Sequence, residues 1–213
     1  MTNPVIDSIR LALGRTAASG VAPRPPVYPA RAADGPDQEL ARFLAEVKLV
    51  SGSAQQVAAG EIASALQVLV QEQQVRKAVL WQTPGLTRLG VGAILGRLGV
   101  ELVSPHADKH TLATCDLGVT EADFALPETG TIALRSSAEK PRAVSVVPRV
   151  HLALVAPSAF RADLHQVFAE SRGDPYLVFI TGPSRTSDIE LVLTLGVHGP
   201  KNLHVWVTDM PAG

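Results

Sequence analysis

Apolar stretches of strand length alternate with stretches of helical periodicity through the first half of this sequence. Strand candidates lie at residues 48–51, 78–81 and 99–103, and longer helix candidates fill residues 54–74 and 83–98. Parallel strands must be joined by a crossover, which is usually a helix, so this order predicts a mostly parallel sheet flanked by helices. The expected fold class is therefore α/β.

The order of the predicted elements changes after Ser104. Strand candidates then follow one another with only turns between them, at residues 116–119, 123–126, 131–134, 143–147 and 150–156. A helix is expected at residues 158–171, and further strands at residues 176–180 and 203–208. We therefore predict that the α/β domain carries an added β-rich portion.

The pattern divides the chain into three segments. Residues 1–14 are expected to form a short amphipathic helix, because Asn3 and Pro4 suit its first positions and Gly14 suits its end. Residues 15–35 contain four prolines among small residues and are predicted to be an extended linker. Residues 36–213 are long enough for one sizeable core, so we expect a single α/β domain there.

Composition argues against several classes of function. The formal net charge is -1 and 18% of residues are charged, which gives little electrostatic support for nucleic-acid binding. The single cysteine, Cys115, excludes an internal disulfide and cannot supply the thiolates of an iron–sulfur cluster. Asp7 and Arg10 interrupt the first apolar residues, and no stretch is apolar enough for a membrane span. We expect a cytoplasmic protein, and its oligomeric state stays open.

The stretch from Tyr176 to Pro200 holds the first candidate site. A turn at Gly182-Pro183 ends the expected strand, and Ser187 with Glu190 fits a capping box, which predicts a helix beginning near Asp188. Two hydroxyls and a guanidinium precede this helix start: Ser184, Arg185 and Thr186. They could hold a carboxylate or phosphate at the positive end of the helix dipole, or they could be solvated turn and capping residues.

The second candidate site lies in residues 118–134. Glu128 precedes a tight turn, Thr129-Gly130-Thr131, so its carboxylate is expected at a loop edge beside hydroxyls and backbone N–H groups. It could act as a base, a nucleophile or a hydrogen-bond acceptor, or it could be a turn residue in water. Asp123 is a further carboxylate in this strand-rich region, where each one needs a partner or water.

Three groups of histidines have different prospects. His106 and His110 have the spacing of a helical metal pair, but Pro105 favours a loop there, so no metal site is expected. His151 begins an expected strand and could be a core residue. His198 has glycines on both sides, which allow a ligand or another backbone to approach closely.

Two long blocks resemble a known family: VTEADFALPETGTIAL at residues 119–134 and TGPSRTSDIELVLTLGVHGPKNLHV at residues 181–205. With Val150-His151-Leu152, they resemble the LUD-domain family, and within it the short lactate-utilisation C type. The resemblance covers residues 37–209. It implies a fold similar to the sugar-phosphate isomerase and CoA-transferase superfamily, a parallel-sheet α/β domain with an added β-rich portion.

The resemblance also implies a role in oxidising L-lactate to pyruvate with two partner proteins, at least one of which carries iron–sulfur clusters. It implies that the matching residues line one pocket for a small carboxylate or related anion. The candidate catalytic residues are Glu128, His198 and Asp123. The candidate substrate-binding residues are Thr129, Gly130, Thr131, His151, Ser184, Arg185, Thr186, Asp188 and Gly199. No metal ion or other cofactor is expected on this chain itself.

Three functions stay open at this point. The first is a non-redox subunit of an iron–sulfur system that oxidises lactate. The second is a free-standing enzyme, either a CoA transferase with Glu128 as nucleophile or a sugar-phosphate isomerase with Glu128 as base. The third is an anion-sensing module that reports through the helix at residues 1–14. Only the resemblance favours the first of these.

Overall fold

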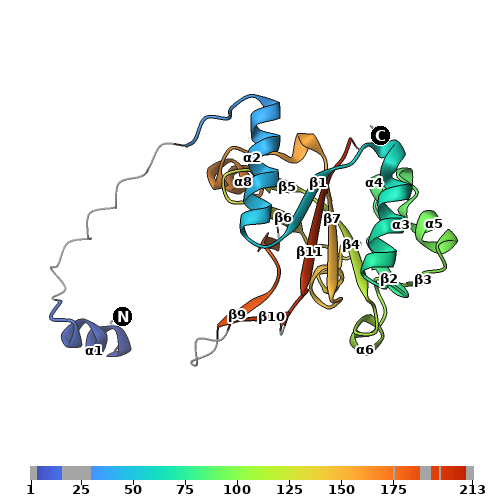
Figure 1. Ribbon diagram of the computed structural model, residues 1–213. Coiled ribbons are helices and arrows are strands. Elements are labelled where there is room, and N and C mark those ends of the chain that lie inside the picture. Colours follow the sequence, from blue (N-terminus) through green and yellow to red (C-terminus); the bar gives the residue numbers. More distant parts are fainter. Residues whose placement is uncertain (1–3, 16–29, 175, 188–192, 197, 210–213) are drawn as a thin grey trace.

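A computed structural model describes residues 4–15, 30–174, 176–187, 193–196 and 198–209. Its main element is a sheet of six strands (Figure 1). In spatial order these are β1 (Ser53–Gln56), β11 (Asn202–Val207), β7 (Val150–Val155), β4 (Leu117–Ala122), β2 (Lys77–Leu80) and β3 (Glu101–Val103). Every neighbouring pair is parallel, which confirms the predicted α/β class.

Helices cover this sheet, as a parallel sheet requires. α2 (Pro36–Leu49) lies beside β1, while α3 (Ile62–Glu72), α4 (Pro84–Arg88) and α5 (Val91–Arg97) lie toward the β2–β3 end (Figure 1). The remaining helical elements are short: η1 (Ala59–Glu61), α6 (Lys109–Leu112), α7 (Ala143–Val146), η2 (Pro157–Ala159) and α8 (Leu164–Glu170). α1 (Pro4–Ala12) buries none of its residues.

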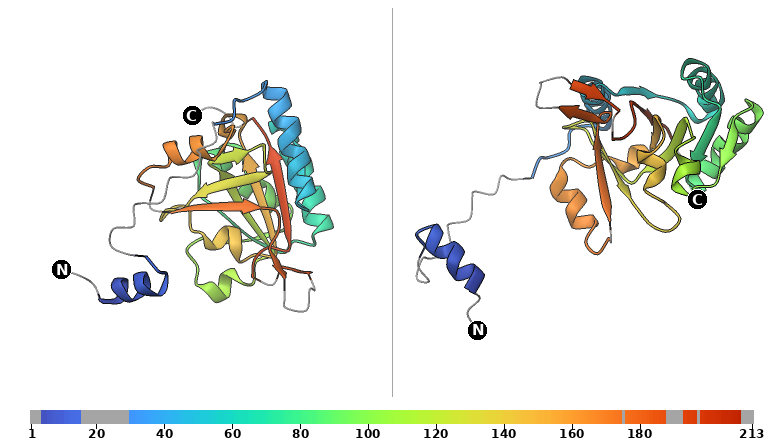
Figure 2. Two further views of the ribbon diagram at one scale, coloured as in Figure 1. Left: turned by 90° about the vertical axis from the view of Figure 1, so that its left-hand side faces the viewer. Right: turned by 90° about the horizontal axis from the view of Figure 1, so that it is seen from below.

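A smaller antiparallel sheet forms the predicted β-rich portion. Its strands are β5 (Phe124–Leu126), β6 (Thr131–Arg135) and β8 (Leu177–Thr181), with β6 in the middle (Figure 2). Thr131 lies opposite Thr181 in the β6–β8 pair. The turn before β6 and the turn after β8 therefore meet at the same end of this sheet. Beyond that end, β9 (Arg185–Ser187) and β10 (Leu193–Leu195) form a separate antiparallel pair.

α2 is held near its start by a buried ion pair. Glu39 is 5% exposed and accepts hydrogen bonds of 2.8 and 2.6 Å from the two guanidinium nitrogens of Arg31. These hydrogen bonds lower the pKa of Glu39 despite its burial. One turn further on, the Phe43 ring packs edge-to-face on Phe160, with 5.2 Å between the ring centroids. The direction of α2 across the sheet edge is fixed by these contacts.

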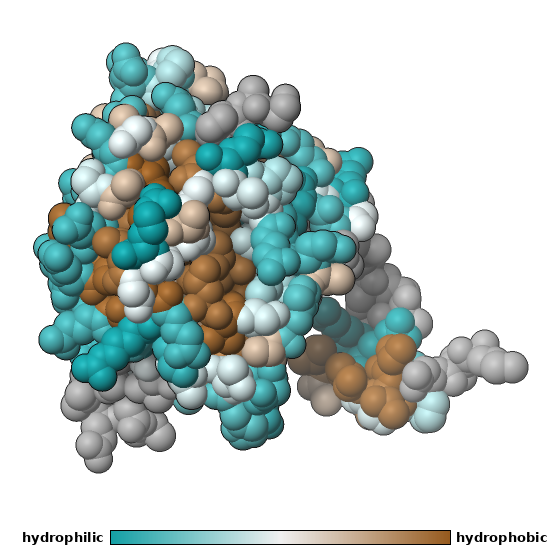
Figure 3. Space-filling model, turned by 90° about the vertical axis from the view of Figure 1, so that its right-hand side faces the viewer, coloured by the Kyte–Doolittle hydropathy of each residue, from teal (hydrophilic) through white to brown (hydrophobic). Residues whose placement is uncertain are grey.

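The β3 edge of the main sheet carries an exposed apolar surface. A cavity of about 590 Å³ lies there, and its apolar lining includes Leu80, Leu86, Leu102 and Val103. Leu102 is 43% exposed. Figure 3 views the molecule from this side and shows hydrophobic surface in the hollow. Among the described residues, none of the helices combines the length and the apolar character that crossing a bilayer requires.

Several predicted elements near the start of the domain are wrong. Residues 48–51 do not form a strand, because α2 continues to Leu49 and β1 starts only at Ser53. Consequently residues 54–56 belong to β1 rather than to the helix expected from residue 54. The helix expected at residues 83–98 is divided at Gly90, whose φ of 66° is left-handed and cannot continue a right-handed helix.

The strand predicted at residues 143–147 is also wrong. Residues 143–147 contain α7 instead of a strand, and α7 crosses β4 where Gly118 leaves room: a Cβ there would lie 1.9 Å from the Val144 carbonyl oxygen. Residues 185–187 and 193–195 pair as β9 and β10, so the helix expected to begin near Asp188 does not include residues 193–195. Residues 188–192 and the expected linker at residues 16–29 lie outside the described residues.

Candidate functional site

A cavity of about 230 Å³ lies between the main sheet, α7 and the end of β8. The sheet contributes His151 and Leu203, α7 contributes Ser145 and Val146, and the rest of the lining comes from residues 179–184 and 198–200. Four predicted site residues line this cavity: His151, Ser184, His198 and Gly199. Residues 145–151 and residues 179–203, which are distant in the sequence, therefore line the same cavity. We call this space the His151 cavity.

His151 is the most buried polar residue of this cavity, with 1% of its surface exposed. Its Nε2 lies 2.8 Å from Oγ1 of Thr120 on the neighbouring strand β4. Its Nδ1 is buried and has no hydrogen-bond partner within the described residues. Burial lowers the pKa of His151 to about 3, because the charged imidazolium would lose its hydration. The ring is therefore neutral at physiological pH.

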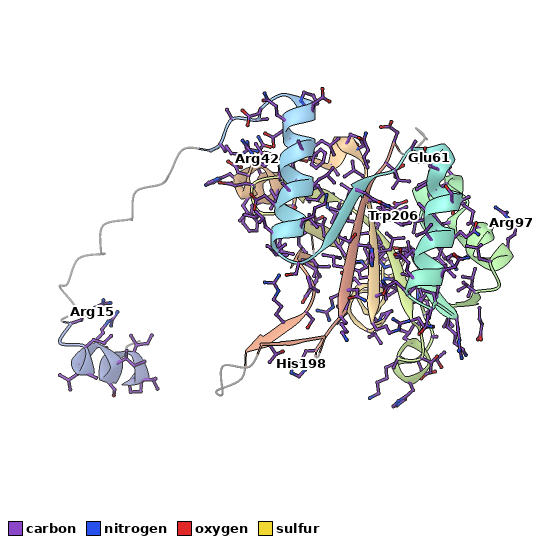
Figure 4. The ribbon with its side chains drawn as sticks, in the orientation of Figure 1. Arg15, Arg42, Glu61, Arg97, His198 and Trp206 are labelled. Carbon is purple, nitrogen blue, oxygen red and sulfur yellow. The ribbon has the colours of Figure 1, made fainter. Side chains whose placement is uncertain are left out.

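Ser184 and His198 form the rim of the cavity. The Ser184 backbone is fixed on both sides, because its N–H donates to the Pro200 carbonyl and its carbonyl accepts from the Gly196 N–H, each at 2.9 Å. Gly199 allows this close packing, since a Cβ there would lie 3.1 Å from Cβ of Ser184. His198 is exposed beside the β9–β10 pair (Figure 4). The rim thus offers a hydroxyl and an imidazole next to water.

Glu128 and Thr129 lie in a different cavity, of about 260 Å³. It is lined also by Arg31, Asp163 and His165, together with Leu126 and Leu164. The Glu128 carboxylate has no hydrogen bond or ion pair within the described part of the chain, whereas Arg31 is committed to Glu39. The structure therefore does not bring Glu128 and His198 into one pocket. We call this second space the Glu128 cavity.

A chain of hydroxyls runs between residues of the two cavities. Oγ1 of Thr129 lies 2.7 Å from Oγ1 of Thr131, which in turn lies 2.7 Å from Oγ1 of Thr181. Thr129 lines the Glu128 cavity, and Thr181 lines the His151 cavity. The two cavities are thus neighbours, separated by the paired ends of β6 and β8.

The end of α2 supports both turns at this place. Gly130 has a φ of 61°, and a Cβ there would lie 2.5 Å from the backbone of Glu46 and Val47. Gly182 has a φ of 76°, and a Cβ there would lie 2.2 Å from the Val50 carbonyl oxygen. Both positions need a left-handed backbone and the absence of a side chain, which only glycine supplies. These two glycines therefore fix the walls of the cavities against α2.

Arg185 and Thr186 line neither cavity. Arg185 is exposed, and its guanidinium donates to the backbone carbonyl of Val50. Thr186 lies in β9 opposite Thr194, and Asp188 is outside the described residues. No side chain with a permanent charge lines the His151 cavity among the residues that the structure describes. The guanidinium expected to hold an anion is therefore not part of this cavity.

The sequence matches a known protein family over most of its length. The family model of the LUD domain matches residues 41–208. The chain belongs to the LUD-domain family. This confirms the resemblance seen in the two sequence blocks.

Curated relatives of this LUD protein include two named Lactate utilization protein C. The one from Shouchella clausii is 32% identical over 165 residues, covering 72% of each chain, and the one from Halalkalibacterium halodurans is 33% identical over 148 residues, covering 64% of each chain. A crystal structure of a DUF162 family protein from Deinococcus radiodurans has a similar fold, with a TM-score of 0.63 and 21% identity. It covers 83% of this chain and 100% of that one, and it supports the α/β assignment.

Asp123 has a structural role in this LUD domain. Its carboxylate accepts from the Arg135 backbone N–H at 2.7 Å and pairs with Nζ of Lys140 at 2.9 Å. The side chain is 11% exposed and lines neither cavity. The hydrogen bonds of this carboxylate are thus made to Arg135 and Lys140, away from both cavities.

The sequence pattern gave no role to Ser145 and Arg31, which line the two cavities, and it did not predict the contact between Thr120 and His151. Thr120 meets His151 only because β4 and β7 are neighbours, and that register cannot be read from either strand alone. Cys115 is 4% exposed, and burial raises the pKa of its thiol. Within the described residues, no group of three or more His, Cys, Asp or Glu side chains is placed to hold a metal ion.

Proposed function

We propose that this LUD protein is the non-redox component of an iron–sulfur-dependent system that oxidises L-lactate to pyruvate, and that it binds a small carboxylate in the His151 cavity. Relatives named Lactate utilization protein C support the role in lactate utilisation. The only cysteine, Cys115, is buried and cannot ligate a cluster by itself. Electron transfer through iron–sulfur clusters therefore belongs to partner proteins in this proposal.

The observation that carries the binding role is the polar arrangement of the His151 cavity. A buried neutral imidazole lies at its base with one unpartnered nitrogen, and Ser184 and His198 lie at its rim. Burying a charge without a partner is costly, whereas a neutral polar group needs only one good hydrogen bond. A molecule of the size of lactate therefore keeps its carboxylate at the hydrated rim and places its uncharged end toward His151.

Calorimetric titration tests the binding role. We expect L-lactate and pyruvate to bind the full chain, and His151→Leu to weaken both affinities by roughly tenfold or more, because a hydrogen bond in a dry site is lost. Arg97→Ala is a matched surface control, since Arg97 lies on α5 far from the cavity (Figure 4). Equal affinity in the wild type and in His151→Leu would remove the cavity from the proposal.

Co-purification tests the partnership. A tagged chain expressed in its own cells is expected to bring down proteins that carry iron–sulfur clusters and that restore lactate oxidation in the mixture. Lactate oxidation by the isolated chain would contradict the proposal that it is a non-redox subunit. Undiminished lactate oxidation in extracts of cells that lack the gene for this chain would contradict the proposal that the system needs it.

The Glu128 cavity favours one alternative, a free-standing enzyme of the CoA-transferase type. Among the described residues Glu128 offers a carboxylate without a hydrogen bond or an ion pair, near the guanidinium of Arg31 and the hydroxyl of Thr129. Such a carboxylate could attack the acyl carbonyl of an acyl-CoA, which would form a mixed anhydride and release the CoA thiolate. The thiolate would then attack the Glu128 carbonyl, release the free acid and leave a covalent thioester between Glu128 and CoA. Intact-mass measurement after incubation with acetyl-CoA or succinyl-CoA would reveal the adduct, and Glu128→Gln would abolish it. If no adduct forms with either donor, this alternative falls.

A further inference from the structure

We propose that Thr120 is a positioning residue that places the proton of the neutral His151 ring on Nδ1, so that the His151 cavity selects ligands whose inner end is a hydrogen-bond acceptor. The ligand half of this inference rests on the proposed function, because it assumes a small organic acid in the cavity. The assignment of the tautomer does not rest on the proposed function, because it follows from the contact between two buried side chains, Thr120 and His151.

The contact between Thr120 and His151 allows two arrangements. In the first, the Thr120 hydroxyl donates to Nε2, and the ring proton is on Nδ1. In the second, Nε2–H donates to Oγ1 of Thr120, which leaves the hydroxyl proton without an acceptor and Nδ1 as a bare lone pair. Within the described residues, Oγ1 of Thr120 has His151 as its sole hydrogen-bond partner.

Burial decides between these arrangements. Thr120 lies on β4 beside β7 and is 0% exposed, so neither water nor a ligand can satisfy a hydroxyl proton left over there. An unsatisfied buried donor destabilises the folded state, and the first arrangement avoids it at Thr120. The first arrangement instead leaves Nδ1–H without a partner, on a ring that lines a cavity. The first arrangement therefore leaves one unmet group, Nδ1–H, whereas the second leaves two, the Thr120 hydroxyl proton and the Nδ1 lone pair.

A donor at Nδ1 restricts what the cavity can hold. An Nδ1–H group cannot ligate a metal ion and cannot accept a hydrogen bond, so an ammonium group or a cation at that place would be repelled. A keto, hydroxyl or carboxyl oxygen would complete the hydrogen bond. Pyruvate and L-lactate present such an oxygen at C2, whereas L-alanine presents an ammonium group at the same position. The cavity should therefore accept the first two and reject the third.

The first experiment reads the tautomer in solution by ¹⁵N–¹H correlation spectra of histidine-labelled full-length protein. We expect the His151 signals of the Nδ1–H form in the wild type and in Thr120→Ser, which keeps the hydroxyl. In Thr120→Val, which has a similar shape but no hydroxyl, we expect the Nε2–H form to appear. A wild-type spectrum of the Nε2–H form, or the same tautomer in Thr120→Val, would overturn the assignment.

The second experiment titrates the same three proteins with pyruvate, L-lactate and L-alanine. The wild type and Thr120→Ser should bind the two oxygen-bearing acids at least tenfold more tightly than L-alanine, and Thr120→Val should lose most of this preference. Unchanged preference in Thr120→Val contradicts the positioning role. If none of the three acids binds while the spectra show the Nδ1–H form, the proposed function and the ligand half fail together, and the role of Thr120 in fixing the tautomer stands.

Discussion

Acidification should destabilise this protein through His151 well above the pH at which carboxylates titrate. The pKa of His151 is about 3 in the folded chain, against 6.5 for an unperturbed histidine. Between these values the unfolded chain takes up a proton that the folded chain cannot, so stability falls as the pH falls. From pH 7.5 to pH 5.0, the two pKa values give a loss of about 2 kcal/mol in the free energy of unfolding.

Urea denaturation at several pH values measures this loss. Trp81 and Trp206 are 0% and 2% exposed, so their fluorescence reports unfolding. His151→Gln is the matched comparison, because an amide can still bond with the Thr120 hydroxyl but does not titrate. The pKa of His204 is also lowered, mainly by desolvation, but this residue is present in both proteins and its effect cancels. If wild type and His151→Gln lose the same stability between pH 7.5 and pH 5.0, the reasoning about His151 is refuted.

Three further substitutions test the framework of the two cavities. Arg31→Ala should lower the free energy of unfolding by about 2 kcal/mol in urea titrations, because it leaves the buried Glu39 carboxylate without its guanidinium; no loss would contradict that role. Gly130→Ala should cost about 3 kcal/mol, since its φ of 61° and its contact with α2 exclude a Cβ, whereas Gly96→Ala, with open space around it, should be neutral or stabilising by about 0.5 kcal/mol. Asp123→Asn should lower the melting temperature but leave lactate affinity unchanged in calorimetry, and a selective loss of affinity would return this residue to the candidate site.

The central strands of the main sheet could be predicted from the sequence. Residues 78–81 are a continuous apolar run of strand length, and residues 150–156 are apolar except for His151; such runs suit strands that are buried on both faces. β1 could not be predicted in this way. Three of its four residues are exposed, and its position as a strand depends on pairing with β11, which comes much later in the chain. In such a segment the secondary structure is determined by pairing with a distant strand and not by the local sequence pattern.

The candidate site was predictable in its residue content more than in its geometry. The glycines and the hydroxyl residues around Thr131 and Gly182 signal tight turns, and both turns are present at one end of the small sheet. That Glu128 and His198 line different cavities could not be read from the sequence, because the end of α2 and the paired strands β6 and β8 determine which side each residue faces. The helix expected after the capping-box pattern at Ser187 does not extend to residues 193–195, which pair with β9, and its expected start lies outside the described residues.

The support that α2 gives to both turns has a consequence for how the chain matures on the ribosome. Arg185 reaches the carbonyl of Val50 across 135 residues, and the backbone N–H of Arg31 reaches Asp163 across 132. Because translation releases the amino-terminal part first, the contacts between the end of α2 and residues 182–185 cannot form until most of the polypeptide has been made. The ligand-binding end of the protein is therefore completed last during synthesis, and a nascent chain stalled before Gly182 should contain most of the parallel sheet but no competent pocket.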